Sequence, residues 1–189
     1  YGLFDRVVND IGVPKTSFKA TDIIIIATPI KSPDGLHKWR RITQITEVRK
    51  TWNDDPLLEG GFVDLMKYDS KTDQLVPTDD LLDGNSDVLK LIAANIPDFA
   101  GDWDAVWDNV ELRGKIKGYI TEKAIETGDD EMFEAPFVIK CNDVFHLMTE
   151  KVKNETGKLD AKQIFFEWQT WFDRDLKKRK INKSYNDNK

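Results

Sequence analysis

The sequence contains few of the residues that build redox or metal chemistry. Of its 189 residues only one is a cysteine, Cys141, and two are histidines, His37 and His146. A single cysteine cannot form an internal disulfide, and isolated histidines do not make the Cys/His clusters that bind structural zinc. On a helix, Cys141 and His146 project about 140° apart, so we interpret Cys141 as a core residue rather than a nucleophile beside a base.

Long apolar runs are also missing. No stretch approaches the roughly 20 apolar residues of a membrane-spanning helix, and no basic segment followed by an apolar one stands at the start. With 40% hydrophobic residues, the chain has enough apolar surface to bury a core. We therefore expect a soluble, intracellular chain. Because Tyr1 already lies in sequence with a structured pattern, we expect a piece of something larger.

Positive charge is in the minority, with 28 Lys and Arg against 34 Asp and Glu and a sequence pI near 5.1. Nucleic-acid binding needs a concentrated positive field, so we do not expect a nucleic-acid partner. Cations gather only near the C-terminal end. They are Lys177, Lys178, Arg179, Lys180 and Lys183. They complement the negative end of a helix dipole, and contact with a membrane surface or a partner stays open as the alternative.

The motifs of common catalytic sites are absent. Gly157 and Lys158 are followed by Leu159 rather than Ser or Thr, and Val152 occupies the position of the first glycine of a phosphate loop. G-x-S-x-G, H-E-x-x-H and C-x-x-C do not occur. A hydrolase that uses loop carboxylates remains a distant alternative. The loop acids are Asp54, Asp55, Asp79, Asp80, Asp129, Asp130 and Glu131.

Residues 21–48 carry the strongest structural pattern. Ile23 to Ile26 are apolar at consecutive positions, which predicts a strand covered by protein on both faces. Pro33, Asp34 and Gly35 predict a turn, so the strands on either side should pair antiparallel. Further strands are predicted at 62–68 and 74–76. The N-terminal part is therefore expected to form an antiparallel meander of three or four strands.

Beyond residue 83 the apolar period becomes helical. The expected helices begin near Ser86, Asp102, Pro136 and Asp160, and Pro97, Gly128 and Gly157 end the first three. Asp160 and Gln163 form a capping-box pattern. The fold class is thus mixed α/β, with a sheet-forming part at 1–82, a helical part at 83–181 and a polar tail at 182–189.

One flank of the last predicted helix is aromatic, with Phe165, Trp168 and Phe172. Aromatic residues at helical spacing pack in a core or contact a partner more often than they stack on bases or sugars. The sequence leaves core packing and partner contact open, and the burial of Trp168 distinguishes them.

Arg40 and Arg41 are adjacent on the second predicted strand. Neighbouring strand residues point to opposite faces, so the pair cannot form one bidentate clamp. The structural interpretation is positive charge that protects an edge strand. The functional interpretation is a guanidinium that reaches phosphate or carboxylate on a neighbour.

Residues 5–48, with "DRVVNDIGVPKTSFKATDIIIIATPI" followed by "RRITQITEV", resemble the C-terminal part of the motor domain of archaeal type II/type IV secretion ATPases, which drive pilus and archaellum assembly. In that family a Val/Ile-Pro segment leads into an Ala-x-Asp-hydrophobic strand, and the next strand opens on Arg-Arg and ends in Ile-x-Glu-Val/Ile. "GGFVDLMKYDSKTDQL" and "WDNVELRGKIKGYI" resemble segments further along. The resemblance covers residues 5 to about 125.

The resemblance implies the C-terminal portion of a RecA-like domain in a cytoplasmic homohexamer docked on a membrane platform protein. ATP and Mg²⁺ belong to the intact family motor, whose phosphate loop, metal-binding strand and histidine box lie upstream of this segment. We therefore expect no catalytic residue, cofactor or metal site in this chain. We expect it to complete the motor and to contact neighbours or the nucleotide periphery through Arg40, Arg41 and Glu47. A stand-alone, non-catalytic interaction module is the alternative.

Overall fold

The structure of the chain, a computed structural model, describes residues 1–32 and 34–186, with side chains as far as Arg179. It divides into two units, called here the sheet unit, Tyr1–Gly101, and the helical unit, which begins at Asp102. Each unit is described by itself.

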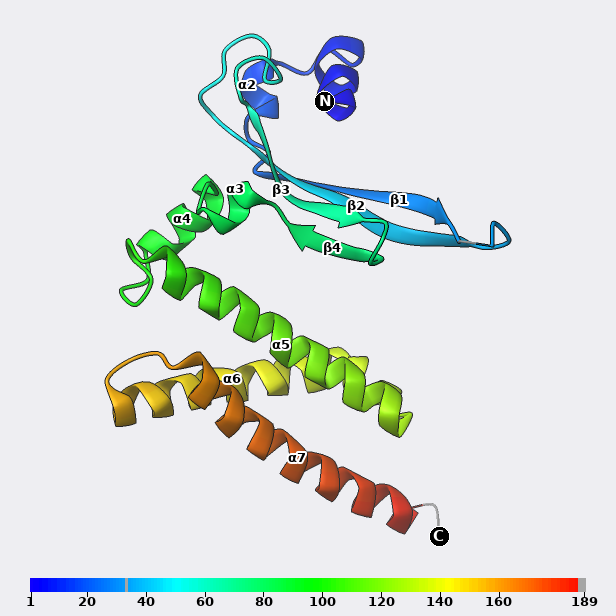
Figure 1. Ribbon diagram of the computed structural model, residues 1–189, viewed down its shortest axis with the longest axis vertical. Coiled ribbons are helices and arrows are strands. Elements are labelled where there is room, and N and C mark those ends of the chain that lie inside the picture. Colours follow the sequence, from blue (N-terminus) through cyan, green and yellow to red (C-terminus); the bar gives the residue numbers. More distant parts are fainter. Residues whose placement is uncertain (33, 187–189) are drawn as a thin grey trace. The chain divides into compact units, whose positions relative to one another are not determined.

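The sheet unit contains short helices around a four-stranded sheet (Figure 1). Its elements are α1 (Gly2–Phe4), a π-helical turn (Asp5–Asp10), α2 (Lys15–Phe18), β1 (Ile23–Lys31), β2 (Lys38–Val48), β3 (Phe62–Asp69), β4 (Gln74–Pro77), α3 (Asp79–Leu82) and α4 (Asp87–Ala94). The strands pair antiparallel in the order β1-β2-β3-β4. The predicted antiparallel meander is confirmed.

The β1–β2 hairpin is longer than the rest of the sheet. β1 pairs with β2 from Ile23–Glu47 to Lys31–Lys38, whereas β3 pairs with β2 only from Gln44 onward. The distal half of the hairpin therefore projects past β3 as a two-stranded arm, which Figure 1 shows. At its tip the Asp34 carboxylate accepts hydrogen bonds from Leu36 N, at 3.0 Å, and from the Ser32 hydroxyl. Pro33, the first residue of the predicted turn, lies outside the described residues.

The isoleucine run corrects one expectation. β1 is an edge strand, and the prediction that both faces of its isoleucines are covered is wrong for the described residues. Ile24 packs against a small aromatic core, but Ile25 is 58% exposed. The physical reason is that α1 and α2 contribute Phe4 and Phe18 to one face only.

That small core is built from edge-on aromatic contacts. The ring centroids of Phe4 and Trp52 are 5.5 Å apart at 89°, and those of Phe4 and Phe18 are 5.2 Å apart at 84°. Trp52 is fully buried, and Gly61 leaves room for it, since a Cβ at Gly61 would lie 2.4 Å from Trp52 Cδ1 and 2.8 Å from Pro56 Cα. The loop between β2 and β3 thus closes over the core without a clash because residue 61 has no Cβ.

The division into units does not coincide with the change from strands to helices, which the sequence places at residue 83. The helices α3 and α4 belong to the sheet unit, and the division follows Gly101. Ser86 caps α4 as predicted, accepting a hydrogen bond from Leu89 N at 3.2 Å. Its hydroxyl also donates to Glu47 on β2 at 2.6 Å, which ties α4 to the sheet.

The helical unit confirms the other predicted helices. Its elements are α5 (Trp103–Thr127), a 3-10 turn η2 (Asp130–Phe133), α6 (Ala135–Thr156) and α7 (Ala161–Asn186). Asp102 and Asp160 accept backbone hydrogen bonds at the starts of α5 and α7, and Gly128 and Gly157 end α5 and α6 in the left-handed conformation. The Gln163 side chain bonds forward along α7 and does not complete the capping box. α7 also continues into the predicted polar tail as far as Asn186.

A continuous apolar core joins α5, α6 and α7. Its buried members are Leu112, Ile116, Ile120, Ala124, Met132, Phe137, Cys141, Phe145, Val152, Ile164, Trp168 and Phe172. Within the part of the chain that the structure describes, no helix combines the length and the apolar character needed to cross a bilayer.

Candidate functional sites

The two arginines of β2 have different surroundings, as expected for adjacent strand residues. Arg41 holds Asp73 in a bidentate pair, with its Nε and Nη2 each 2.8 Å from one carboxylate oxygen. Tyr68 donates its hydroxyl to the same carboxylate at 2.8 Å, and the guanidinium lies 5.0 Å from the Trp39 ring centroid. Arg41 is therefore occupied within the sheet unit.

The bonds from Arg41 and then from Tyr68 favour the ionised form of Asp73 and lower the pKa of its carboxyl group to about 2. The same contact raises the pKa of Arg41. Asp73 has φ of +54°, a left-handed conformation that Asp and Asn tolerate better than most residues. The β3–β4 turn thus presents its carboxylate to β2 in a fixed orientation.

Arg40 remains outward-facing on the projecting arm. Its side chain is exposed and, among the described residues, its guanidinium has no hydrogen-bond or ion-pair partner. Lys31 and Lys38 lie on the same arm. The carboxylate of Asp34, at the tip of the arm, accepts hydrogen bonds within the turn. The arm is a basic feature of an acidic chain.

Glu47, which the sequence grouped with the arginines, is 1% exposed. Its carboxylate accepts hydrogen bonds from Ser86 Oγ at 2.6 Å and from Asp87 N at 2.9 Å, and Arg49 Nη1 lies 3.3 Å from it. A buried carboxylate at a helix N-terminus, neutralised by an arginine, is well satisfied. The structure therefore gives Glu47 a role in joining α4 to β2 and leaves it closed to a neighbour.

The three aromatic residues of α7 that the sequence grouped together differ in burial. Trp168 and Phe172 are fully buried, and Trp168 Nε1 donates to the Cys141 carbonyl oxygen at 3.0 Å. Of the two alternatives, core packing therefore describes these two residues. Phe165 is half-buried and lines a pocket.

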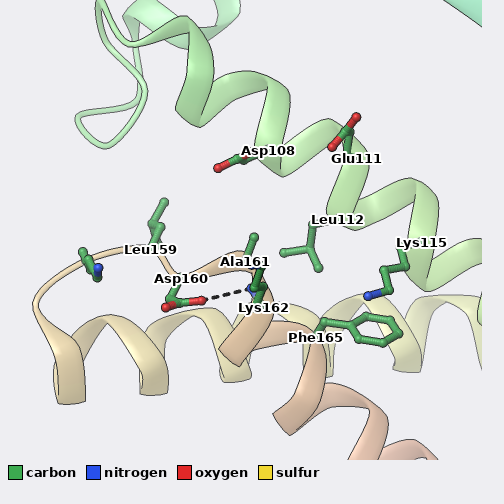
Figure 2. Close-up of a pocket in the computed structure, with 10 residues that line it drawn as sticks. Asp108, Glu111, Leu112, Lys115, Leu159, Asp160, Ala161, Lys162 and Phe165 are labelled. Atoms are coloured by element: carbon green, nitrogen blue, oxygen red, sulfur yellow. Dashed lines mark hydrogen bonds between the residues drawn. The ribbon is translucent and has the colours of Figure 1, made fainter.

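This pocket, of about 450 Å³, lies where the start of α7 faces α5. Figure 2 shows Asp108, Glu111 and Lys115 on α5 and Asp160 and Phe165 at the start of α7, all of which line the pocket. Lys115 Nζ is 3.9 Å from the Phe165 ring centroid, and the Asp160 carboxylate accepts from the backbone N–H groups that begin α7. Those N–H bonds lower the pKa of Asp160, so it is an ionised helix cap rather than a proton donor. Sequence reasoning missed this pocket because its two sides are about 50 residues apart.

Cys141, the candidate nucleophile considered from the sequence, is buried. Desolvation raises the pKa of the buried Cys141 thiol to about 12, so it is unreactive. Within residues 1–32 and 34–179, no group of three or more His, Cys, Asp or Glu side chains could hold a metal ion.

The C-terminal cations are described in part. Arg179 bridges Asp129 and Glu131 of the turn after α5, with Nη2 at 3.2 and 3.0 Å, and its guanidinium lies over the Phe137 ring. It therefore stabilises the helical unit. Lys180 and Lys183, which the sequence assigned to the same cluster, have no described side chains.

Comparisons of the sequence with models of known protein families and with curated proteins found no match.

Proposed function

We propose that this chain is the C-terminal, non-catalytic part of the motor domain of a secretion or pilus-assembly ATPase, and that it completes the motor by contacts along β1 and at Arg40. The proposal rests on the order of sequence features from Asp5 to Val48. The place that it assigns to the contact is β1, a strand of consecutive isoleucines that lies at the open edge of the sheet with Ile25 58% exposed.

An apolar edge strand tends to associate with another chain, because its unpaired N–H and C=O groups can form a ladder with a further strand and its side chains can be buried in the contact. Proteins protect such edges with charge, proline or a covering element. Here Pro29 blocks pairing only at the distal end of β1, since it has no N–H, and residues 23–28 stay open. This leaves room for a partner polypeptide, in the proposal the preceding part of the RecA-like domain, to add to the edge and cover Ile25.

The same proposal assigns separate roles to the arginines. Arg41 is held by Asp73 and stabilises the fold, whereas the exposed Arg40 reaches a carboxylate or phosphate on a neighbouring subunit of a homohexamer. ATP and Mg²⁺ bind in the remainder of the motor. A cytoplasmic location and a membrane platform partner belong to this proposal.

The first test is the coding sequence immediately upstream. The proposal predicts a G-x-x-x-x-G-K-[ST] loop in the same reading frame or in an adjoining gene, and a start codon directly before Tyr1 with no such loop nearby would contradict it.

The second test uses the assembled motor. Arg40→Ala is expected to lower hexamer formation and the ATPase rate while the melting temperature stays unchanged. Lys38→Ala, on the same arm, is the matched control and should leave all three readouts unchanged. If Arg40→Ala also leaves assembly and rate at the level of the unaltered motor, the role of Arg40 is wrong.

The alternative, a stand-alone interaction module, is favoured by the separate apolar core of the helical unit. It predicts that the isolated chain is fully folded and that no other polypeptide protects β1. Hydrogen exchange at β1 therefore distinguishes the two functions.

A further inference from the structure

A second hollow in the helical unit lies between α5 and α6. This groove has a volume of about 290 Å³. Its apolar lining residues are Ile116, Ile120, Val138, Ile139, Cys141 and Phe145. Ile139 is 59% exposed, so apolar surface continues beyond the groove. A hollow of this kind between two helices accepts the apolar side of a third helix.

The rim of the groove is cationic. Arg113 Nε donates to Asn109 Oδ1 at 3.1 Å and Nη1 to Asn142 Oδ1 at 3.4 Å, and the guanidinium lies 4.7 Å from the Phe145 ring centroid. Both hydrogen-bond partners are neutral amides. Lys117 is exposed on the same rim, and no lining residue is an acid.

Arg113 differs in this respect from the other half-buried arginines. Each of those contacts a carboxylate: Arg41 that of Asp73, Arg49 that of Glu47, and Arg179 that of Asp129. Within the described residues Arg113 has no carboxylate partner, although acids outnumber bases in the chain. A partly desolvated guanidinium beside an apolar groove is matched by an apolar ligand that carries an anionic group.

The sheet unit presents a surface of that chemistry. On α4, Leu91 is 72% and Ile92 56% exposed. The flanking segment, residues 79–98, contains five aspartates and one lysine. Asp87 is paired with Arg49 inside the sheet unit, whereas Asp79, Asp80 and Asp83 are exposed. The exposed face of α4 is thus apolar with acids beside it, which is the chemistry that the groove and its rim match.

We propose that α4 of one copy of this chain docks in the α5–α6 groove of a second copy. Leu91 and Ile92 enter the groove, and aspartates of the 79–98 segment lie against Arg113 and Lys117. Because the two surfaces differ, the contact is head-to-tail and leaves one of each free on every pair, so it propagates into a ring or a filament. This assignment goes beyond the proposed motor function and does not depend on it.

Sedimentation velocity of the full chain tests the contact. The mean mass should rise with protein concentration and fall with added salt, since screening weakens the charged rim. Leu91→Ser with Ile92→Ser, called the helix variant, and Ile139→Ser with Arg113→Met, called the groove variant, should each stay monomeric. Arg113→Met alone should weaken association about fivefold.

Mixing the two variants gives the sharpest result. The helix variant keeps its groove and the groove variant keeps its α4, so an equal mixture should form a one-to-one dimer that does not grow further. A mixture that remains monomeric, or that grows beyond a dimer, overturns head-to-tail docking. An unaltered chain that is monomeric at every concentration also overturns it.

Two variants control for nonspecific loss of surface. Lys115→Met and Phe166→Ser remove a cation and an exposed aromatic from the helical unit outside the groove, and association should stay at the level of the unaltered chain. Circular dichroism confirms that each variant is folded. β1 and Arg40 are unchanged throughout, so failure here leaves the proposed motor function standing.

Discussion

The sheet unit and the helical unit hold their elements together in different ways. The helical unit has a continuous core of buried aliphatic and aromatic side chains. The sheet unit buries a small aromatic cluster and adds charge pairs, the buried Glu47 with Arg49 and the more exposed Arg41 with Asp73. Apolar burial is additive and tolerant of pH, but charge pairs depend on each partner and on ionisation. Substitutions should therefore affect the two units by different mechanisms.

The largest effect is expected in the helical core. Trp168→Ala removes a fully buried ring that also bonds the Cys141 carbonyl, and should lower the free energy of unfolding of the helical unit by about 3–5 kcal/mol. Urea unfolding followed by amide NMR signals from each unit measures it. Phe166→Ala, exposed on the same helix, is the control and should change stability by less than about 0.5 kcal/mol. A comparable loss in both variants would contradict the assigned core.

In the sheet unit, the corresponding change is Glu47→Ala. It leaves Arg49 and the N-terminus of α4 without their carboxylate and should cost about 3 kcal/mol, because half of a buried pair is worse than none. The NMR signals of α4 should broaden first. A Glu47→Ala protein with unchanged α4 signals and unchanged stability would show that α4 is not held by this residue.

Gly61→Ala should destabilise the sheet unit by about 1–3 kcal/mol, because the added methyl group overlaps Trp52 and the Pro56 backbone. Gly114→Ala is the matched change on α5, where a Cβ meets nothing within 4 Å. There the better helix propensity of alanine should stabilise by about 1 kcal/mol. Thermal unfolding of both variants checks the opposite signs, and the same sign in both would refute the packing at Gly61.

The smallest expected effect is the pH dependence of the Arg41–Asp73 pair. Its contribution to stability should be fully present above the ordinary carboxyl pKa of 3.8 and lost as the pH falls through about 2, since the folded-state pKa is depressed. Asp73→Asn keeps the left-handed turn and should remove this part of the acid sensitivity. Urea midpoints between these pH values compare the two proteins, and identical pH profiles would contradict the pairing.

The sequence predicted local structure better than it predicted burial. Caps at Ser86, Asp102 and Asp160 and left-handed stops at Gly128 and Gly157 are set by nearby residues, so the helix limits could be predicted. The exposure of Ile25 could not be predicted, because a run of four isoleucines reads the same in a central strand and in an edge strand. The role of Glu47 was also hidden, since its hydrogen-bond partners at the start of α4 lie about 40 residues away.

The contacts of the arginine pair show the same limit. Alternation along a strand predicts that Arg40 and Arg41 face different surroundings. That Arg41 is the one paired with a carboxylate is seen only in the fold, because the β3–β4 turn brings Asp73 next to β2. The pocket between α5 and the start of α7 and the groove between α5 and α6 are also lined by residues far apart in sequence, and no local sequence pattern indicates either of them.

Hydrogen exchange along β1 tests the central claim most directly, namely that this chain completes a motor through its open edge. In the isolated chain, the outward amides of residues 23–28 should exchange fast while those paired with β2 stay protected. Joined to the preceding motor polypeptide, the same outward amides should become protected. Equal exchange at these amides in the isolated chain and in the joined protein would contradict the account.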